Sequence, residues 1–126
     1  MIEPLFARID SKSEELVSFT QELVRIPTIN PPGEDYLKCA ELLGNRLAKS
    51  GFSLLYERAN NTPGDSERYP RHNVIARIEG KHSGPCVHFN GHLDVVVAGN
   101  GWTVAPFEGV VRDGKIYGRG TCDMKG

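Results

Sequence analysis

The sequence predicts an α/β fold in which a mixed β-sheet is flanked by helices. Two stretches in the N-terminal half carry apolar residues at helical spacing, and shorter apolar segments bounded by turn residues follow them. Helices packed on one sheet would bury both apolar surfaces in a single core. A length of 126 residues suits one domain, so residues 1–126 are assigned to a single domain.

Two helices are expected before the first strand. Residues 11–26 form the first, because Ser11 and Glu14 have the spacing of a capping box. Residues 34–50 form the second, and Gly51 suits its C-terminal cap. Their apolar stripes, which we expect to face the core, comprise Leu16, Phe19, Leu23 and Ile26, and Tyr36, Leu37, Ala40, Leu43 and Leu47.

Short strands and a hairpin make up the predicted sheet. The expected strands are residues 52–58, 73–79 and 85–91, with a polar loop at 60–72. The third strand contains Val87 and Phe89 and would need cover on its apolar face. Asp113-Gly114 lies between residues 107–111 and 115–117 and is typical of a tight β-hairpin turn.

Composition and charge exclude several classes of partner. The formal net charge is −1 and no run of like charge is present, which argues against nucleic-acid and anionic-membrane partners. No apolar stretch is long enough to span a membrane. Cys39, Cys86 and Cys122 are odd in number and far apart, so no disulfide framework is expected. A reducing, cytoplasmic location is the simplest inference.

His92 and Asp94 are the first candidate site residues. His92 directly follows an apolar segment and a glycine, which would place its imidazole at the carboxyl end of a strand, where α/β sheets build their sites. In an extended chain, residues two apart point the same way, so Asp94 can accept a hydrogen bond from one ring nitrogen while the other binds a metal. A surface histidine beside an aspartate, with no metal, is the alternative for this tripeptide alone.

Asp123 is the second candidate. It lies in Gly118-Arg119-Gly120-Thr121-Cys122-Asp123-Met124-Lys125-Gly126, where the glycines permit unusual backbone before the carboxylate. A carboxylate has two oxygens and can bridge two cations, and a metal pair can activate water and polarise a carbonyl. Capping of a following helix is the alternative role.

Several fixed elements occur together and in order. They are Gly91-His92-Leu93-Asp94-Val95-Val96, Trp102, Pro106-Phe107, Asp113-Gly114, Tyr117-Gly118-Arg119-Gly120 and Asp123-Met124-Lys125-Gly126, with Leu23-Val24-Arg25-Ile26-Pro27-Thr28 and Asn30-Pro31-Pro32-Gly33 earlier. This pattern resembles the zinc aminoacylase and peptidase family, and within it most closely acetylornithine deacetylase and succinyl-diaminopimelate desuccinylase. Val97 departs from it, because such families usually have proline there.

The resemblance implies roles for the candidate residues. His92 matches a metal-binding histidine, Asp94 the catalytic aspartate that orients it, and Asp123 the carboxylate that bridges two metals. Two Zn²⁺ ions are expected, with Co²⁺ a possible substitute, and the implied reaction is hydrolysis of the amide bond of a small N-acyl-amino acid. The family also tends to hold the bond after the bridging aspartate, here Asp123–Met124, in cis.

The resemblance covers only the first part of the family's di-zinc catalytic domain. The family's general-base glutamate, its remaining metal ligands and its lid domain, which carries the homodimer contacts of a complete enzyme, come later than residue 126. We therefore expect little or no hydrolase activity from this chain alone. Two alternatives stay open: a dipeptidase or carboxypeptidase of the same group, and a non-catalytic truncated product or interaction piece.

Overall fold

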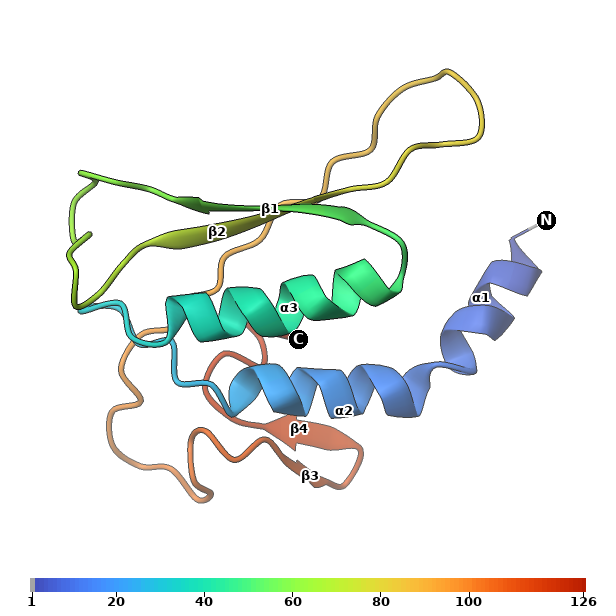
Figure 1. The fold of residues 1–126 in the computed structure, drawn as a ribbon. Helices are drawn as coiled ribbons and strands as arrows, with labels where there is room; N and C mark the ends of the chain where they lie inside the picture. The colour runs from blue at the N-terminus through green and yellow to red at the C-terminus, as the bar shows by residue number, and fades with distance from the viewer. Residues whose placement is uncertain (1) are drawn as a thin grey trace. The chain divides into compact units, whose positions relative to one another are not determined.

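The computed structural model describes residues 2–126, which divide into two compact units (Figure 1). One unit contains residues 26–97, and the other contains residues 2–25 together with 98–126. The elements in chain order are α1 (Glu3–Asp10), α2 (Ser13–Val24), α3 (Tyr36–Lys49), β1 (Ser53–Arg58), β2 (His72–Arg77), β3 (Val110–Arg112) and β4 (Lys115–Tyr117). The predicted α/β class is confirmed at this level.

In the unit of residues 26–97, α3 packs along the antiparallel β1–β2 pair (Figure 1). The helix buries Cys39, Ala40 and Gly44. A Cβ at Gly44 would collide with the hydroxyl of Tyr56 on β1, so glycine is what lets helix and strand approach closely. The predicted cap at Gly51 is confirmed: its φ is 89°, and its amide donates to the carbonyl of Ala48 in the bond pattern of a Schellman motif.

The same unit joins two segments that are distant in sequence. Ile29 and Val95 form an isolated parallel bridge. The amide of Val95 donates to the Thr28 carbonyl at 2.9 Å, and the amide of Asn30 donates to the Val95 carbonyl at 2.9 Å. The Thr28 hydroxyl adds a bond to the Leu93 carbonyl at 2.5 Å. Thr28 and Val95 are both buried, so this pairing holds the backbone around residues 92–95 beside the loop that starts at Asn30.

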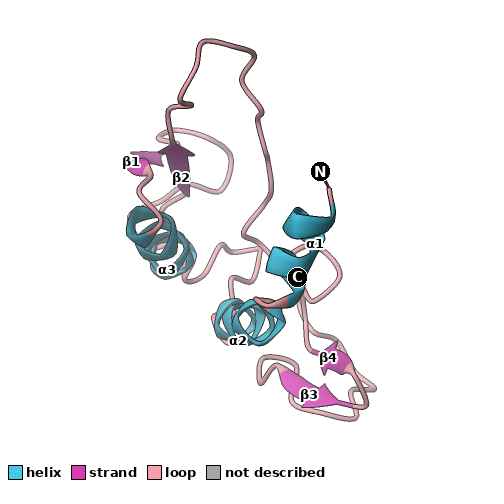
Figure 2. Ribbon diagram, turned by 90° about the vertical axis from the view of Figure 1, so that its right-hand side faces the viewer, coloured by secondary structure: helices cyan, strands magenta, loops and turns pink. Residues whose placement is uncertain are grey.

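In the other unit, α1 leads into α2, and β3 and β4 form a two-stranded antiparallel sheet (Figure 2). The hairpin prediction is confirmed. Asp113 and Gly114 have φ values of 53° and 70°, as a two-residue type I′ turn requires. The side chain of Gln21 on α2 donates to the Gly109 carbonyl at 2.6 Å, which fastens the start of the hairpin to this helix.

The helix predicted at residues 11–26 is shorter than expected and its capping box is absent. Ser11 closes α1 instead, where its hydroxyl donates to the Arg8 carbonyl at 2.8 Å, and α2 has no side-chain cap. The capping prediction was wrong because α1 had not been foreseen. Pro4 near its start was a local signal for that helix.

The sheet differs most from expectation. Residues 85–91 form no strand, and Val87 and Phe89 are 74% and 89% exposed. The strands of the described residues make two separate two-stranded antiparallel sheets, in place of one mixed sheet. A strand exists only where a neighbour supplies its hydrogen bonds, and residues 85–91 have none among residues 2–126. Within that same part of the chain, no helix is long and apolar enough to cross a membrane.

Candidate functional site

His92 and Asp94 lie together, as the sequence predicted. The Nδ1 atom of His92 lies 3.0 Å from the backbone oxygen of Asp94 and 3.3 Å from its carboxylate Oδ1. Both partners are acceptors only, so these contacts favour the tautomer of the neutral ring that carries its proton on Nδ1. Its lone pair is then on Nε2, which is the arrangement of a histidine that binds a metal through that atom. The sequence had assigned the acceptor role to the carboxylate, whereas the hydrogen bond goes to the carbonyl and the carboxylate lies 3.3 Å away.

Three further residues extend this pair within the same unit. The side-chain amide of Asn30 donates to Asp94 Oδ2 at 3.2 Å, and Arg71 Nη2 donates to Asn30 Oδ1 at 3.0 Å. Arg71 Nη1 donates to the Tyr36 hydroxyl at 2.7 Å. The chain of contacts therefore runs from His92 through Asp94, Asn30 and Arg71 to Tyr36.

These contacts influence the pKa of the Tyr36 phenol. Burial raises the pKa of its phenol above the usual value, and the negative charge of Asp94 raises it further. The guanidinium of Arg71 opposes both effects, through its charge and its hydrogen bond. Tyr36 therefore remains a neutral hydrogen-bond acceptor for Arg71 at physiological pH.

Sequence reasoning missed the roles of Arg71 and Tyr36. Tyr36 was predicted only as part of a buried helical stripe, and Arg71 only as part of a polar loop. Asn30 had a signal, since it opens the Asn-Pro-Pro-Gly motif that belongs to the resemblance. Arg71, one of two arginines in the polar loop, carries no such signal.

Asp123 lies in the other unit, in a turn fixed by its neighbours. The amide of Lys125 donates to the Gly120 carbonyl at 2.7 Å, and its Nζ donates to the Leu23 carbonyl at the end of α2 at 3.0 Å. Gly120 has a φ of 89°, a conformation that favours glycine. The Asp123–Met124 bond is cis, as the resemblance implied, and the Asp123 side chain is exposed.

Arg119 and Trp102 hold a loop of this second unit. The guanidinium of Arg119 stacks 5.3 Å from the centre of the Trp102 ring. Both side chains donate to the Ala98 carbonyl, at 3.0 Å and 2.7 Å. These contacts of Arg119 therefore tie down the backbone of this loop. Cys122, the residue before Asp123, is exposed.

The fit to a metal is partial. The His92 ring has the hydrogen bonding of a metal ligand. Among residues 2–126, no group of three or more histidine, cysteine, aspartate or glutamate side chains could hold a metal ion. A catalytic zinc commonly needs three protein ligands, so the described residues do not by themselves make up such a site.

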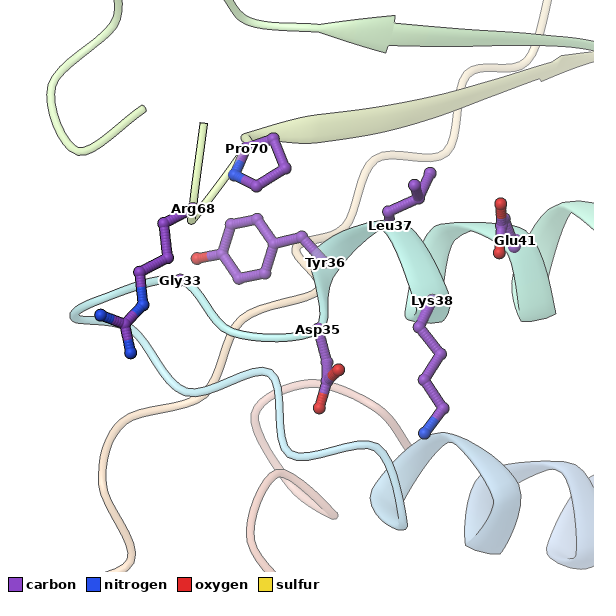
Figure 3. Close-up of a pocket in the computed structure, with 8 residues that line it drawn as sticks. All are labelled: Gly33, Asp35, Tyr36, Leu37, Lys38, Glu41, Arg68 and Pro70. Atoms are coloured by element: carbon purple, nitrogen blue, oxygen red, sulfur yellow. The ribbon is translucent and has the colours of Figure 1, made fainter. Parts of the chain in front are cut away.

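An open cavity of about 290 Å³ lies beside the start of α3 (Figure 3). Its lining residues are Gly33, Asp35, Tyr36, Leu37, Lys38, Glu41, Arg68 and Pro70. Charges of both signs surround it, and the lining includes neither His92 nor Asp94. The cavity is therefore separate from His92 and Asp94. Tyr36 lines the cavity and also ends the chain of contacts that starts at His92.

Comparison with known proteins agrees with the motifs. Residues 88–126 match the model of peptidase family M20/M25/M40. The whole chain is 33% identical to N-formyl-4-amino-5-aminomethyl-2-methylpyrimidine deformylase of Halalkalibacterium halodurans, covering 29% of that protein. It is similar to two succinyl-diaminopimelate desuccinylases: that of Xanthobacter autotrophicus at 38% identity, over 87% of this chain and 27% of the relative, and that of Methylobacterium radiotolerans at 41%, over 84% and 25%.

The chain thus spans between 25% and 29% of the length of these three relatives. The family match includes His92, Asp94 and Asp123, and the longer alignments add the segment with Asn30 and Arg71. The resemblance drawn from the motifs is therefore confirmed, and this chain is similar to part of the proteins of peptidase family M20/M25/M40.

Proposed function

We propose that this chain contributes to a metal-dependent hydrolase that cleaves the amide bond of N-acyl-amino acids. The observation that carries the proposal is the contact of His92 Nδ1 with Asp94, which leaves Nε2 as the basic nitrogen of the ring. The match of residues 88–126 to a hydrolase family supports it.

Each candidate residue has a proposed part. His92 would hold a zinc ion through Nε2, Asp94 would fix the tautomer and orientation of that ring, and Asp123 would be a ligand shared by two zinc ions, with cobalt as a possible substitute. Bound zinc would supply Lewis acidity and a nucleophile at neutral pH. Because the described residues do not by themselves make up a zinc site, the proposal assigns the remaining ligands to residues of a complete protein.

The substrate class follows from the named relatives. A desuccinylase and a deformylase both remove an acyl group, which favours a small acylated amine over a dipeptide. We include a cytoplasmic location and a homodimeric complete enzyme in the proposal.

Zinc titration by calorimetry on the 126-residue chain tests the ligand assignment. We expect the zinc affinity of the chain to fall when His92 is changed to Ala and, in a separate variant, when Asp123 is changed to Ala. His82→Ala and Asp10→Ala are matched controls, since both residues are exposed. Loss of a hydrogen bond that supports a metal ligand weakens metal binding by about 10–100-fold. Loss of a residue that binds the metal directly is expected to weaken it by more than this.

Either result is informative. Equal affinities for the His92→Ala and His82→Ala chains would overturn the ligand role of His92. If zinc binds as proposed, release of amine from N-succinyl, N-acetyl and N-formyl substrates is the next measurement, and we expect little or no release by the 126-residue chain alone.

A further inference from the structure

Asn30 joins a residue that can only donate hydrogen bonds to one that can only accept them. Arg71 Nη2 lies 3.0 Å from Asn30 Oδ1, and Asn30 Nδ2 lies 3.2 Å from Asp94 Oδ2. A guanidinium has no acceptor, and an ionised carboxylate has no donor. The amide can therefore take one orientation, in which its NH₂ group faces Asp94. Rotating it by half a turn would set donor against donor and acceptor against acceptor.

Arg71 is itself held on several sides. Its Nη1 donates to the Tyr36 hydroxyl at 2.7 Å, and its guanidinium lies 5.0 Å from the centre of the Tyr36 ring. Gly33 and Gly64 leave the space it occupies: a Cβ at Gly33 would lie 2.7 Å from Nη1, and one at Gly64 would collide with Nη2. The position of the guanidinium is thus set by packing as well as by hydrogen bonds, and Asn30 receives a fixed donor.

The consequence reaches His92. With Oδ2 of Asp94 bound by Asn30, the second carboxylate oxygen is the one that lies 3.3 Å from His92 Nδ1. A carboxylate without the Asn30 bond can rotate about its last torsion, which is broad and roughly two-fold. His92 would then keep the Asp94 carbonyl at 3.0 Å as the acceptor for its Nδ1 proton and lose the charged one.

We propose that Asn30 and Arg71 are positioning residues that hold the Asp94 carboxylate against His92. Arg71 fixes the orientation of the Asn30 amide, and Asn30 fixes the carboxylate. The link to metal binding rests on the proposed function. The positioning itself does not, because it concerns contacts within the chain alone.

Asn30→Asp is the sharpest test. Aspartate has nearly the shape of asparagine and still accepts a hydrogen bond from Arg71, so the packing around the guanidinium is kept. It replaces the donor that faces Asp94 with an oxygen, which repels the carboxylate. Asn60→Asp makes the same chemical change at an exposed residue of the loop and is the matched control.

The readout is the His92 ring in long-range ¹H–¹⁵N NMR spectra of the 126-residue chain, at a pH where the ring is neutral. His92→Gln identifies the signals. We expect an Nδ1-bound proton in the parent and in Asn60→Asp. In Asn30→Asp, exchange of that proton with water should quicken by about tenfold, because the carboxylate that lies 3.3 Å from Nδ1 is no longer held there.

Two arginine variants separate positioning from folding. Arg71→Met is expected to quicken the exchange as Asn30→Asp does, and Arg71→Lys, which keeps a donor for Asn30, is expected to recover part of the slow exchange. If Arg71→Met fails to fold, the comparison of Arg71→Lys with Asn30→Asp still decides.

The zinc titration distinguishes the two proposals. A parent chain that binds no zinc but loses slow exchange in Asn30→Asp would overturn the proposed function and uphold the positioning role. Zinc binding that depends on His92, together with equal exchange rates in the parent and in Asn30→Asp, would overturn the positioning role alone.

Discussion

Lys125 gives the most quantitative prediction for stability. It is 7% exposed, and its Nζ donates to the Leu23 carbonyl, one of the last carbonyls of α2. A hydrogen bond to a charged group contributes about 1.5–3 kcal/mol, and a cation at a helix C-terminus adds about 0.3–1 kcal/mol. Lys125→Met keeps the unbranched stem and so costs little packing. Burying an ammonium group offsets part of the gain, so we expect a loss of about 2 kcal/mol.

Urea unfolding followed by circular dichroism measures this loss. With a slope of about 1–3 kcal/mol per molar urea for a small protein, the midpoint of Lys125→Met should fall by about 1 M. Lys115→Met is the control, because Lys115 is exposed at the start of β4. An unchanged midpoint in Lys125→Met would refute the reasoning, since the buried ammonium would then contribute no net stability.

Three further outcomes are expected. Arg58 donates a hydrogen bond to Asp65 and holds the pKa of that carboxyl below its usual value. This contact stabilises the fold at a pH above the unfolded pKa of about 3.9, and the stabilisation is lost as the pH falls through the lower folded pKa. Asp65→Asn should therefore lower the Tm at pH 7 and leave it unchanged at a pH below both values, and equal Tm values at pH 7 would contradict this. The ring of Phe89 is 89% exposed, so Phe89→Ser should reduce self-association in sedimentation velocity, and an equally associated variant would count against an apolar contact there. Because the charge of Asp94 raises the pKa of Tyr36, Asp94→Asn should lower that pKa, as followed by NMR of the Tyr36 ring, and a constant pKa would show that the charge is not felt.

Local features of the fold were predictable from the sequence, and non-local ones were not. The Asp113-Gly114 turn and the Gly51 cap depend on positive φ values that few residues adopt, so the residue types reveal them. Residues 85–91 have the composition of a strand, but composition does not say whether a pairing partner is present.

In the candidate site too, the local contact could be predicted from the sequence and the non-local contacts could not. The spacing of His92 and Asp94 predicted their contact, because residues two apart in an extended chain point the same way. The contact of Asp94 with Asn30, and through it with Arg71, depends on how the chain folds back on itself. No pattern within the loop at residues 59–71 marks Arg71 as different from the other arginines around it.

The loop between β1 and β2 is more constrained by its contacts than a polar surface loop usually is. Polar connections of this kind usually tolerate insertion and shortening. Here Asp65 accepts hydrogen bonds from the side chain of Arg58 and the backbone of Arg71, and Gly64 packs against the Arg71 guanidinium. Loop length therefore determines where that guanidinium sits. Shortened or grafted versions of this loop should change the surroundings of Asp94 even when both strands remain paired, so the loop is a poor place to attach tags or to trim the chain.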